Sequence, residues 1–265
     1  MPALIFDCDG VLAETEMHGH LPAFNQTFRE FGVPVQWSVD EYGEKVQIGG
    51  GKERMNGEFT AELAARWSDF PTTGQELDAL ITAMHQRKTA LYTQLVASGV
   101  IAPRPGVARL ARQAAAADWQ LAVASTSAEP SVRAVLRHAM GEQLAARFAV
   151  FAGDIVARKK PAPDIYLRTM EELRVAASDA VVIEDSGIGL RAARAAGLPT
   201  VVTVSAYTAD EDFAGAALVL TSLGDLSQGE PLRVLAAASE VFPVGEVDLA
   251  DVAGLRLPDT DKEAT

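Results

Sequence analysis

The sequence predicts an α/β fold built on a parallel sheet, with a helical unit inserted after the first strand. Short apolar segments recur along the chain, and helix-forming stretches lie between them. Runs that are apolar throughout suit strands buried on both faces of a parallel sheet. Their alternation with helices is typical of a doubly wound α/β domain. The expected strands cover residues 3–6, 121–124, 149–151, 180–183, 200–204 and 217–220.

Helices are expected between these strands. Gly197 follows the last of them in the core, where a glycine commonly ends a helix. Residues 16–98 show no alternating strand pattern, and their helices are expected near 21–31 and over 75–96. Pro103 and Pro105 then mark the return to the core. The expected core helices cover residues 106–117, 130–139, 165–173 and 190–196.

We therefore divide the chain into three parts. Residues 1–15 and 99–225 are expected to form a discontinuous α/β core, and residues 16–98 an inserted helical cap. Residues 226–265 form a C-terminal extension of uncertain structure. Within it, residues 232–238 predict a short helix, and the last eight residues, PDTDKEAT, are expected to fray.

Composition and charge limit the classes of partner. The formal charge of -13 argues against broad binding to nucleic acid or to an anionic membrane, although a few placed cations would still hold a small phosphorylated ligand. The single cysteine, Cys8, is expected to be an inert core residue. The chain begins without the pattern of a secretory signal, and no run reaches the ~18 apolar residues that cross a bilayer. We expect a cytoplasmic protein.

Acidic and hydroxyl side chains follow three of the predicted strands. Asp7 and Asp9 end the first strand, Ser125 ends the second, and Glu184 and Asp185 end a later one. Ligands of parallel α/β sheets bind at this edge. Because like charges repel in a buried setting, a bound cation is expected, and Mg²⁺ suits carboxylates combined with phosphate oxygens.

Together these groups predict phosphoryl transfer. A carboxylate such as Asp7 can attack phosphorus, and Ser125 precedes an expected helix start that can hold phosphate. Lys159 or Lys160, which precede the segment PAPD, can neutralise the transferring group. Each group alone has a structural explanation: a solvated turn, a helix cap or a surface loop. Their shared place at the strand ends favours the catalytic interpretation.

The segment IGGGKERM lies within the predicted cap. Gly49, Gly50 and Gly51 let the backbone approach a ligand closely, and Lys52 and Arg54 follow at once. In isolation the segment would be a flexible basic turn. In a lid over a phosphoryl-transfer site, which also has to exclude water, it is predicted to grip a second phosphate. His85 and His138 lie singly on expected helices, and we assign both a structural role.

The segments FDCDGVLAE, VAST, KKPAPD and VVIEDSGIG resemble the motifs of the haloacid dehalogenase superfamily of phosphatases. The resemblance implies a Rossmannoid core with a parallel sheet and hydrolysis through an aspartyl-phosphate. Asp7 would be the nucleophile, and Asp9 the general acid and base. Ser125 and Lys160 would hold the transferring phosphate, and Lys160 is preferred to Lys159 because it immediately precedes the proline.

The same resemblance implies a Mg²⁺ site. Asp7 and Asp185 would bind the metal directly, Asp9 through its backbone carbonyl, and Glu184 either directly or through water.

Further stretches resemble the CbbY-like branch of this superfamily: AETE, GHLPAFN, GGKERM and SAYTADEDFAGA, within residues 3–224. The branch implies a sugar bisphosphate, such as xylulose 1,5-bisphosphate, as the substrate. Gly49 stands where the branch has threonine. The residues expected to face the substrate are Glu14, His20, Tyr42, Gly50, Gly51, Lys52, Arg54, Thr126 and Ser127.

Two other functions remain open at this point. A hexose-phosphate mutase resembling β-phosphoglucomutase shares the core motifs and has a similar cap. A non-catalytic module that binds a phosphorylated ligand could also use a carboxylate cluster, a hydroxyl and a lysine. Such modules usually have no inserted cap and need no acid like Asp9. The oligomeric state and the exact sugar phosphate are left open.

Overall fold

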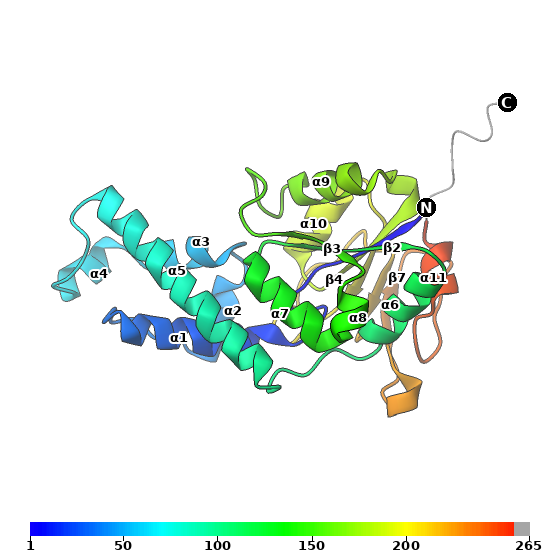
Figure 1. Ribbon diagram of the computed structural model, residues 1–265, viewed down its shortest axis with the longest axis horizontal. Coiled ribbons are helices and arrows are strands. Elements are labelled where there is room, and N and C mark those ends of the chain that lie inside the picture. Colours follow the sequence, from blue (N-terminus) through cyan, green and yellow to red (C-terminus); the bar gives the residue numbers. More distant parts are fainter. Residues whose placement is uncertain (257–265) are drawn as a thin grey trace.

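The computed structural model describes residues 1–256, and the predicted fraying of PDTDKEAT lies outside this range. Within it, seven strands form one sheet in the order β3-β2-β1-β4-β5-β6-β7 (Figure 1). The first six strands pair in parallel, as predicted, and β7 pairs antiparallel to β6. The strands are β1 (Ala3–Phe6), β2 (Gln120–Ser125), β3 (Phe148–Ala152), β4 (Ala180–Glu184), β5 (Thr200–Thr203), β6 (Leu218–Leu220) and β7 (Val234–Ala237).

The last strand corrects one prediction. The helix expected over residues 232–238 is wrong, because residues 234–237 form β7 and their backbone pairs with β6. Leu218 pairs with Ala237, and Val219 pairs with Ala236. Alanine and leucine favour a helix locally, but the open edge of β6 supplies hydrogen-bonding partners that outweigh this weak preference.

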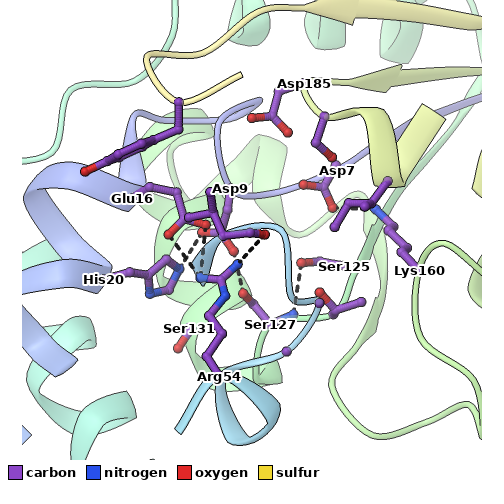
Figure 2. A pocket seen from close by; sticks show the side chains of 18 of the residues that line it. Asp7, Asp9, Glu16, His20, Arg54, Ser125, Ser127, Ser131, Lys160 and Asp185 are labelled. Carbon is purple, nitrogen blue, oxygen red and sulfur yellow. Dashed lines mark hydrogen bonds and ion pairs between the residues drawn. The ribbon is translucent and has the colours of Figure 1, made fainter. Parts of the chain in front are cut away.

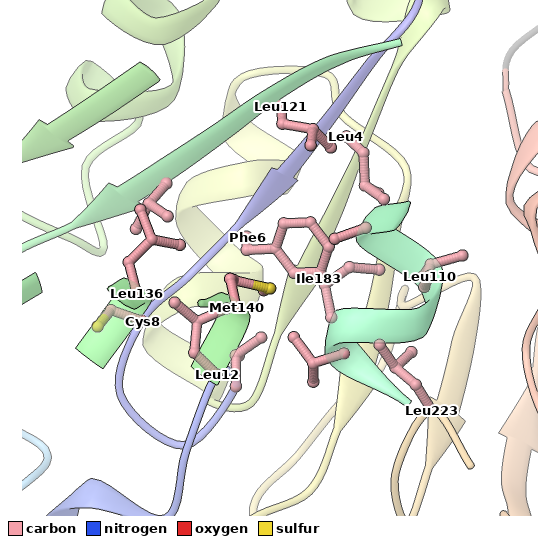
Figure 3. Close-up of a cluster of buried hydrophobic side chains, with 14 of the residues drawn as sticks. Leu4, Phe6, Cys8, Leu12, Leu110, Leu121, Leu136, Met140, Ile183 and Leu223 are labelled. Atoms are coloured by element: carbon pink, nitrogen blue, oxygen red, sulfur yellow. The ribbon is translucent and has the colours of Figure 1, made fainter. Parts of the chain in front are cut away.

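Side chains of β1 alternate between the two faces of the sheet. Leu4 and Phe6 enter one apolar cluster, and Ala3 and Ile5 enter another. Cys8 lies with Leu4 and Phe6 in the first cluster, buried and without a disulfide partner, as expected (Figure 3). Alternation therefore turns Asp7 and Asp9 away from this cluster and toward the strand ends.

Helices cover both faces of the sheet. The face of Leu4 and Phe6 is covered by α6 (Val107–Ala116), α7 (Glu129–Met140), α8 (Glu142–Ala145) and α11 (Leu249–Gly254). The opposite face is covered by α9 (Asp164–Leu173) and α10 (Gly187–Ala195). Gly197 has a φ of +78° just after α10, which confirms its predicted role at the helix end. Two short 3₁₀ turns, η2 (Ala177–Asp179) and η3 (Leu226–Gln228), complete this part.

Between β1 and α6 the chain forms a helical segment that lies to one side of the sheet (Figure 1) and has an apolar cluster of its own. Phe24, Phe28, Trp37, Tyr42 and Met84 are among the buried members of this cluster. We call this segment the cap, and its exact boundaries remain a prediction. Its elements are a π-helical turn η1 (Glu16–His20), α1 (Leu21–Glu30), α2 (Val39–Lys45), α3 (Gly51–Asn56), α4 (Ala61–Arg66) and α5 (Gly74–Ala97).

Local sequence explains where the long cap helix begins. Thr73 accepts a hydrogen bond from the backbone N–H of Glu76, and the Glu76 carboxylate accepts one from the backbone of Thr73. This reciprocal cap satisfies two backbone donors at the start of α5. None of the helices within residues 1–256 has the length and hydropathy needed to cross a bilayer.

Candidate active site

A pocket lies between the carboxyl ends of the central strands and the cap (Figure 2). The core contributes Asp7, Asp9, Ser125, Lys160 and Asp185, all of which were predicted from the sequence. The predicted cap and loop residues that also line it are His20, Gly50, Gly51, Arg54, Thr126 and Ser127. The topology therefore gathers residues from β1, β2, β4 and the cap around one cavity.

Three carboxylates meet beside a buried lysine. Asp7, Glu184 and Asp185 each offer an oxygen within 4.8 Å of the others. The Lys160 ammonium donates to Asp7 Oδ1 and to Glu184 Oε1, each at 2.7 Å, and to the carbonyl of Ala124 at 2.9 Å. One buried cation thus offsets part of the negative charge of this cluster.

Glu184 is fully buried and its oxygens are well supplied with donors. Besides Lys160, the Tyr166 hydroxyl donates to Oε1 at 2.5 Å, and the backbone N–H of Asp185 donates to Oε2 at 3.1 Å. A Cβ on Gly189 would overlap this carboxylate, so the helix α10 can approach it only with glycine at this position. The arrangement fixes the Glu184 carboxylate within the cluster, although Glu184 itself, unlike Asp7 and Asp185, does not line the pocket.

The acidities in the cluster follow from burial and charge. Burial raises the pKa of Asp7 to about 7, and the neighbouring Glu184 adds to this, while Lys160 opposes it. Burial and the charge of Glu184 also hold the pKa of Asp185 well above its usual range. Burial alone would lower the pKa of Lys160, but the carboxylates of Asp7 and Glu184 outweigh it and hold that pKa well above its usual value. Each carboxyl would ionise more readily next to a further cation.

Asp9 lies in a different environment. Its Oδ1 accepts hydrogen bonds from the Thr15 hydroxyl at 2.6 Å and the Tyr92 hydroxyl at 3.3 Å, and it lies 2.9 Å from His20 Nε2. Its Oδ2 accepts a hydrogen bond from the Ser127 hydroxyl (Figure 2). Burial would raise the pKa of Asp9, but His20 and these donors outweigh it and hold the pKa far below its usual range. The pKa of Asp7 is therefore raised and that of Asp9 lowered, although only one residue separates them.

The cap side of the pocket carries a second charged group. Arg54 Nη1 lies 3.3 Å from Glu16 Oε2 and donates to the Tyr42 hydroxyl at 2.7 Å, and that hydroxyl donates to Glu16. Lys88 Nζ lies 2.6 Å from His20 Nδ1, which connects α5 to the partner of Asp9. Burial lowers the pKa of Lys88 to about 7.

Some predicted residues lie outside the pocket lining. Glu14 pairs with Arg104, and Lys52 pairs with Asp154 at 2.6 Å, where it lines an adjoining cleft. Tyr42 is buried behind the wall and reaches the site only through its hydroxyl. His138 lies 2.7 Å from the carbonyl of Ile101, in keeping with a structural role.

Other lining residues were missed by the sequence analysis. Lys88 follows Met84 by four residues and precedes Tyr92 by four, so a lysine on the buried stripe of α5 was a usable signal. The CbbY-like resemblance pointed to Glu14, but Glu16, which begins η1, lines the pocket, whereas Glu14 precedes η1 and pairs with Arg104. His85, given a structural role, lines the pocket as well. The loop after β5 adds Ser205, Tyr207, Thr208 and Glu211.

Comparisons with known proteins agree with this geometry. The haloacid dehalogenase-like hydrolase family matches residues 1–197. A CBBY-like protein of Arabidopsis thaliana is 46% identical over 84% of this chain and 69% of its own length. A CbbY protein of Cupriavidus necator is 42% identical over 97% of this chain and 96% of its own length.

A solved structure is similar as well. It shows a variant of CbbY from Rhodobacter sphaeroides in complex with xylulose 1,5-bisphosphate, and it is 41% identical with a TM-score of 0.74. The alignment covers 86% of this chain and 98% of that one. From the family match and these relatives, the chain belongs to the haloacid dehalogenase-like hydrolases, and among them to the CbbY-like proteins.

Proposed function

We propose that this chain is a cytoplasmic, Mg²⁺-dependent phosphatase that hydrolyses a sugar bisphosphate such as xylulose 1,5-bisphosphate. The observation that carries the proposal is the carboxylate cluster of Asp7, Glu184 and Asp185 beside Lys160. It lies at a pocket that Arg54 of the cap lines as well. The similar CbbY structure that contains this bisphosphate supports the choice of substrate.

The residues present fit a divalent metal. Their oxygens are close enough to share one ion, and carboxylate oxygens are the ligands that Mg²⁺ prefers. A Cβ on Gly10, whose φ is +75°, would overlap the Asp185 carboxylate, so this glycine leaves room for that side chain at the end of β1. Asp7 and Asp185 would hold the ion, with the backbone carbonyl of Asp9. Glu184 would act directly or through water. When bound, the metal would neutralise charge on the phosphate oxygens.

The remaining chemistry belongs to side chains of this chain. An Asp7 oxygen would attack phosphorus, forming a bond to it as the bond between phosphorus and the sugar oxygen breaks. Asp9 would give the leaving oxygen a proton and later take one from the water that hydrolyses the aspartyl-phosphate. Because its pKa is held low, Asp9 would have to take that first proton from solvent as the negative substrate approaches. Ser125 and Lys160 would hold the transferring group.

The cap would bind the other end of the substrate. Arg54 lines the pocket, with Gly50 and Gly51 beside it. We also propose Glu14, Tyr42 and Lys52 as substrate contacts, as the CbbY-like resemblance implies. Arg54→Leu should raise KM for a sugar bisphosphate several-fold more than KM for a monophosphate ester. Arg66→Leu, an exposed residue of α4, is the matched control. Equal effects on both substrates would argue against a phosphate contact at Arg54.

The function is tested by phosphate release from a panel of sugar mono- and bisphosphates with Mg²⁺. The proposal predicts the highest kcat/KM for a pentulose 1,5-bisphosphate. Conversion of β-glucose 1-phosphate to the 6-phosphate without phosphate release would instead indicate a mutase. Binding without turnover of any ester would indicate a non-catalytic module.

A further inference from the structure

An ionic cluster joins the cap to the core outside the catalytic pocket. Lys159 Nζ donates to Glu53 Oε1 of α3 at 2.6 Å and lies 2.9 Å from Asp154 Oδ1, in the segment after β3. Lys52 Nζ, also on α3, donates to Asp154 Oδ2 at 2.6 Å. We call Lys52, Glu53, Asp154 and Lys159 the clasp. The cap contributes Lys52 and Glu53, and the core contributes Asp154 and Lys159. Each side therefore carries one positive and one negative charge, and each charge faces an opposite charge on the other side.

The clasp is directly connected to the catalytic lysine. Lys159 precedes Lys160, whose ammonium holds Asp7. The cap also touches the backbone here, because a Cβ on Gly49 would lie only 2.9 Å from the carbonyl oxygen of Lys160. The same dipeptide therefore contacts the cap through the Lys159 side chain and the Lys160 carbonyl, and contacts the reacting carboxylate through Lys160 Nζ.

We propose that the clasp holds the cap closed against the core in the free protein, with Lys159 and Asp154 as positioning residues that act through Lys160 and the Gly49–Gly51 loop. The role in cap closure does not depend on the proposed function, whereas any consequence for turnover rests on it.

The strength of the clasp suits a lid that has to open. The side chains of Glu53, Lys52 and Asp154 are 43%, 38% and 57% exposed, and that of Lys159 is 16% exposed. Ion pairs of this kind are individually weak and are screened by salt. Substrate has to pass between cap and core, so a weak contact that reforms easily is appropriate.

Other contacts keep the cap attached when the clasp is broken. Tyr207 of the core packs edge-on against Tyr42 of the cap, with ring centroids 5.8 Å apart. Gln47 of the cap donates to Glu211 Oε1 of the core at 2.6 Å. Variants of the clasp are therefore expected to fold and to change only how often the cap opens.

The test measures cap opening without substrate. Cysteines introduced at Glu62 on α4 and Glu171 on α9, both exposed, carry a donor and an acceptor dye, while the buried Cys8 stays unlabelled. Lys159→Met removes the pairs that Lys159 makes with Glu53 and Asp154. Asp154→Asn removes the negative charge that pairs with Lys52 and Lys159. Arg158→Met removes a neighbouring charge that pairs with Asp164 instead, and serves as the matched control.

In single-molecule energy transfer at low salt, both clasp variants should increase the ratio of open to closed molecules roughly three- to fivefold, the effect of losing a partly exposed ion pair. Arg158→Met should match the wild type, and about 0.5 M salt should open the wild type to the level of the variants. Wild-type distances in both clasp variants, an equal change in Arg158→Met, or no effect of salt on the wild type would overturn the proposal.

Discussion

Removal of the divalent metal should destabilise this protein to an extent that depends on pH. Burial raises the pKa of Asp7 from 3.8 to about 7, and burial also raises that of Asp185. In metal-free protein, the contribution of Asp7 to stability is complete below about pH 4 and is lost as the pH rises toward 7. A metal requires the ionised carboxylate, so stabilisation by Mg²⁺ should grow over the same range.

The size of this effect follows from the pKa. Below about pH 7, each unit of pH weakens Mg²⁺ binding tenfold if Asp7 alone must lose a proton, which is about 1.4 kcal/mol of stabilisation at saturating metal. Between about pH 7 and pH 5.5 the loss is about 2 kcal/mol. For a protein of this length that corresponds to ~4–8 °C in Tm. The pKa of Asp185 is also raised, so its loss of a proton would make Mg²⁺ binding depend on pH in the same direction.

The assay is thermal unfolding followed by circular dichroism, with excess Mg²⁺ and with EDTA, at both pH values. At each pH, the Tm with EDTA is subtracted from the Tm with Mg²⁺. This difference removes the contribution of groups that titrate in the same way with and without the metal, such as His85, whose pKa is lowered to about 4 by burial. Asp69→Asn, an exposed cap residue, should behave as the wild type, and Asp7→Asn should flatten the pH dependence. The reasoning would be refuted if Mg²⁺ raised the Tm of the wild type by the same amount at both pH values.

Three further substitutions test other parts of the account. Gly10→Ala should weaken Mg²⁺ affinity at least tenfold, because the new methyl group displaces the Asp185 carboxylate; a metal titration of Tm that matches the wild type would contradict this. Phe6→Ala should cost about 3–5 kcal/mol in urea unfolding, since Phe6 is fully buried at the centre of the sheet, and a loss below about 1 kcal/mol would place it outside the core. Gly49→Ala should raise the open fraction of the cap in the energy-transfer assay, because its Cβ would press on the carbonyl of Lys160, and a closed cap in this variant would show that the contact yields.

The core of the site could be predicted from the sequence because it follows from topology. Asp7, Ser125 and Asp185 each follow an apolar run, and parallel strands bring their carboxyl ends to one edge. Asp9 and Lys160 were placed by the motifs around them. No long-range packing detail was needed to predict that these residues meet.

The cap side was harder because its contacts depend on helix register and on tertiary pairing. Glu14 and Glu16 lie two positions apart, yet of the two only Glu16 lines the pocket, beside Arg54. Lys52 was predicted from its place after the glycine run and from the CbbY-like resemblance, and its pairing with Asp154, about a hundred positions along the chain, has no local signal. The strand β7 was mistaken for a helix for the same reason, since its partner β6 lies outside the segment.

The most direct measurement of the central claim is turnover by the Asp7→Asn variant, combined with mass spectrometry of acid-quenched wild-type enzyme. With Mg²⁺ and xylulose 1,5-bisphosphate, the account predicts a phosphorylated Asp7 in the wild type and no phosphate release by a folded Asp7→Asn protein. Phosphate release by that variant at the wild-type rate, or a covalent phosphate on a different residue, would contradict it.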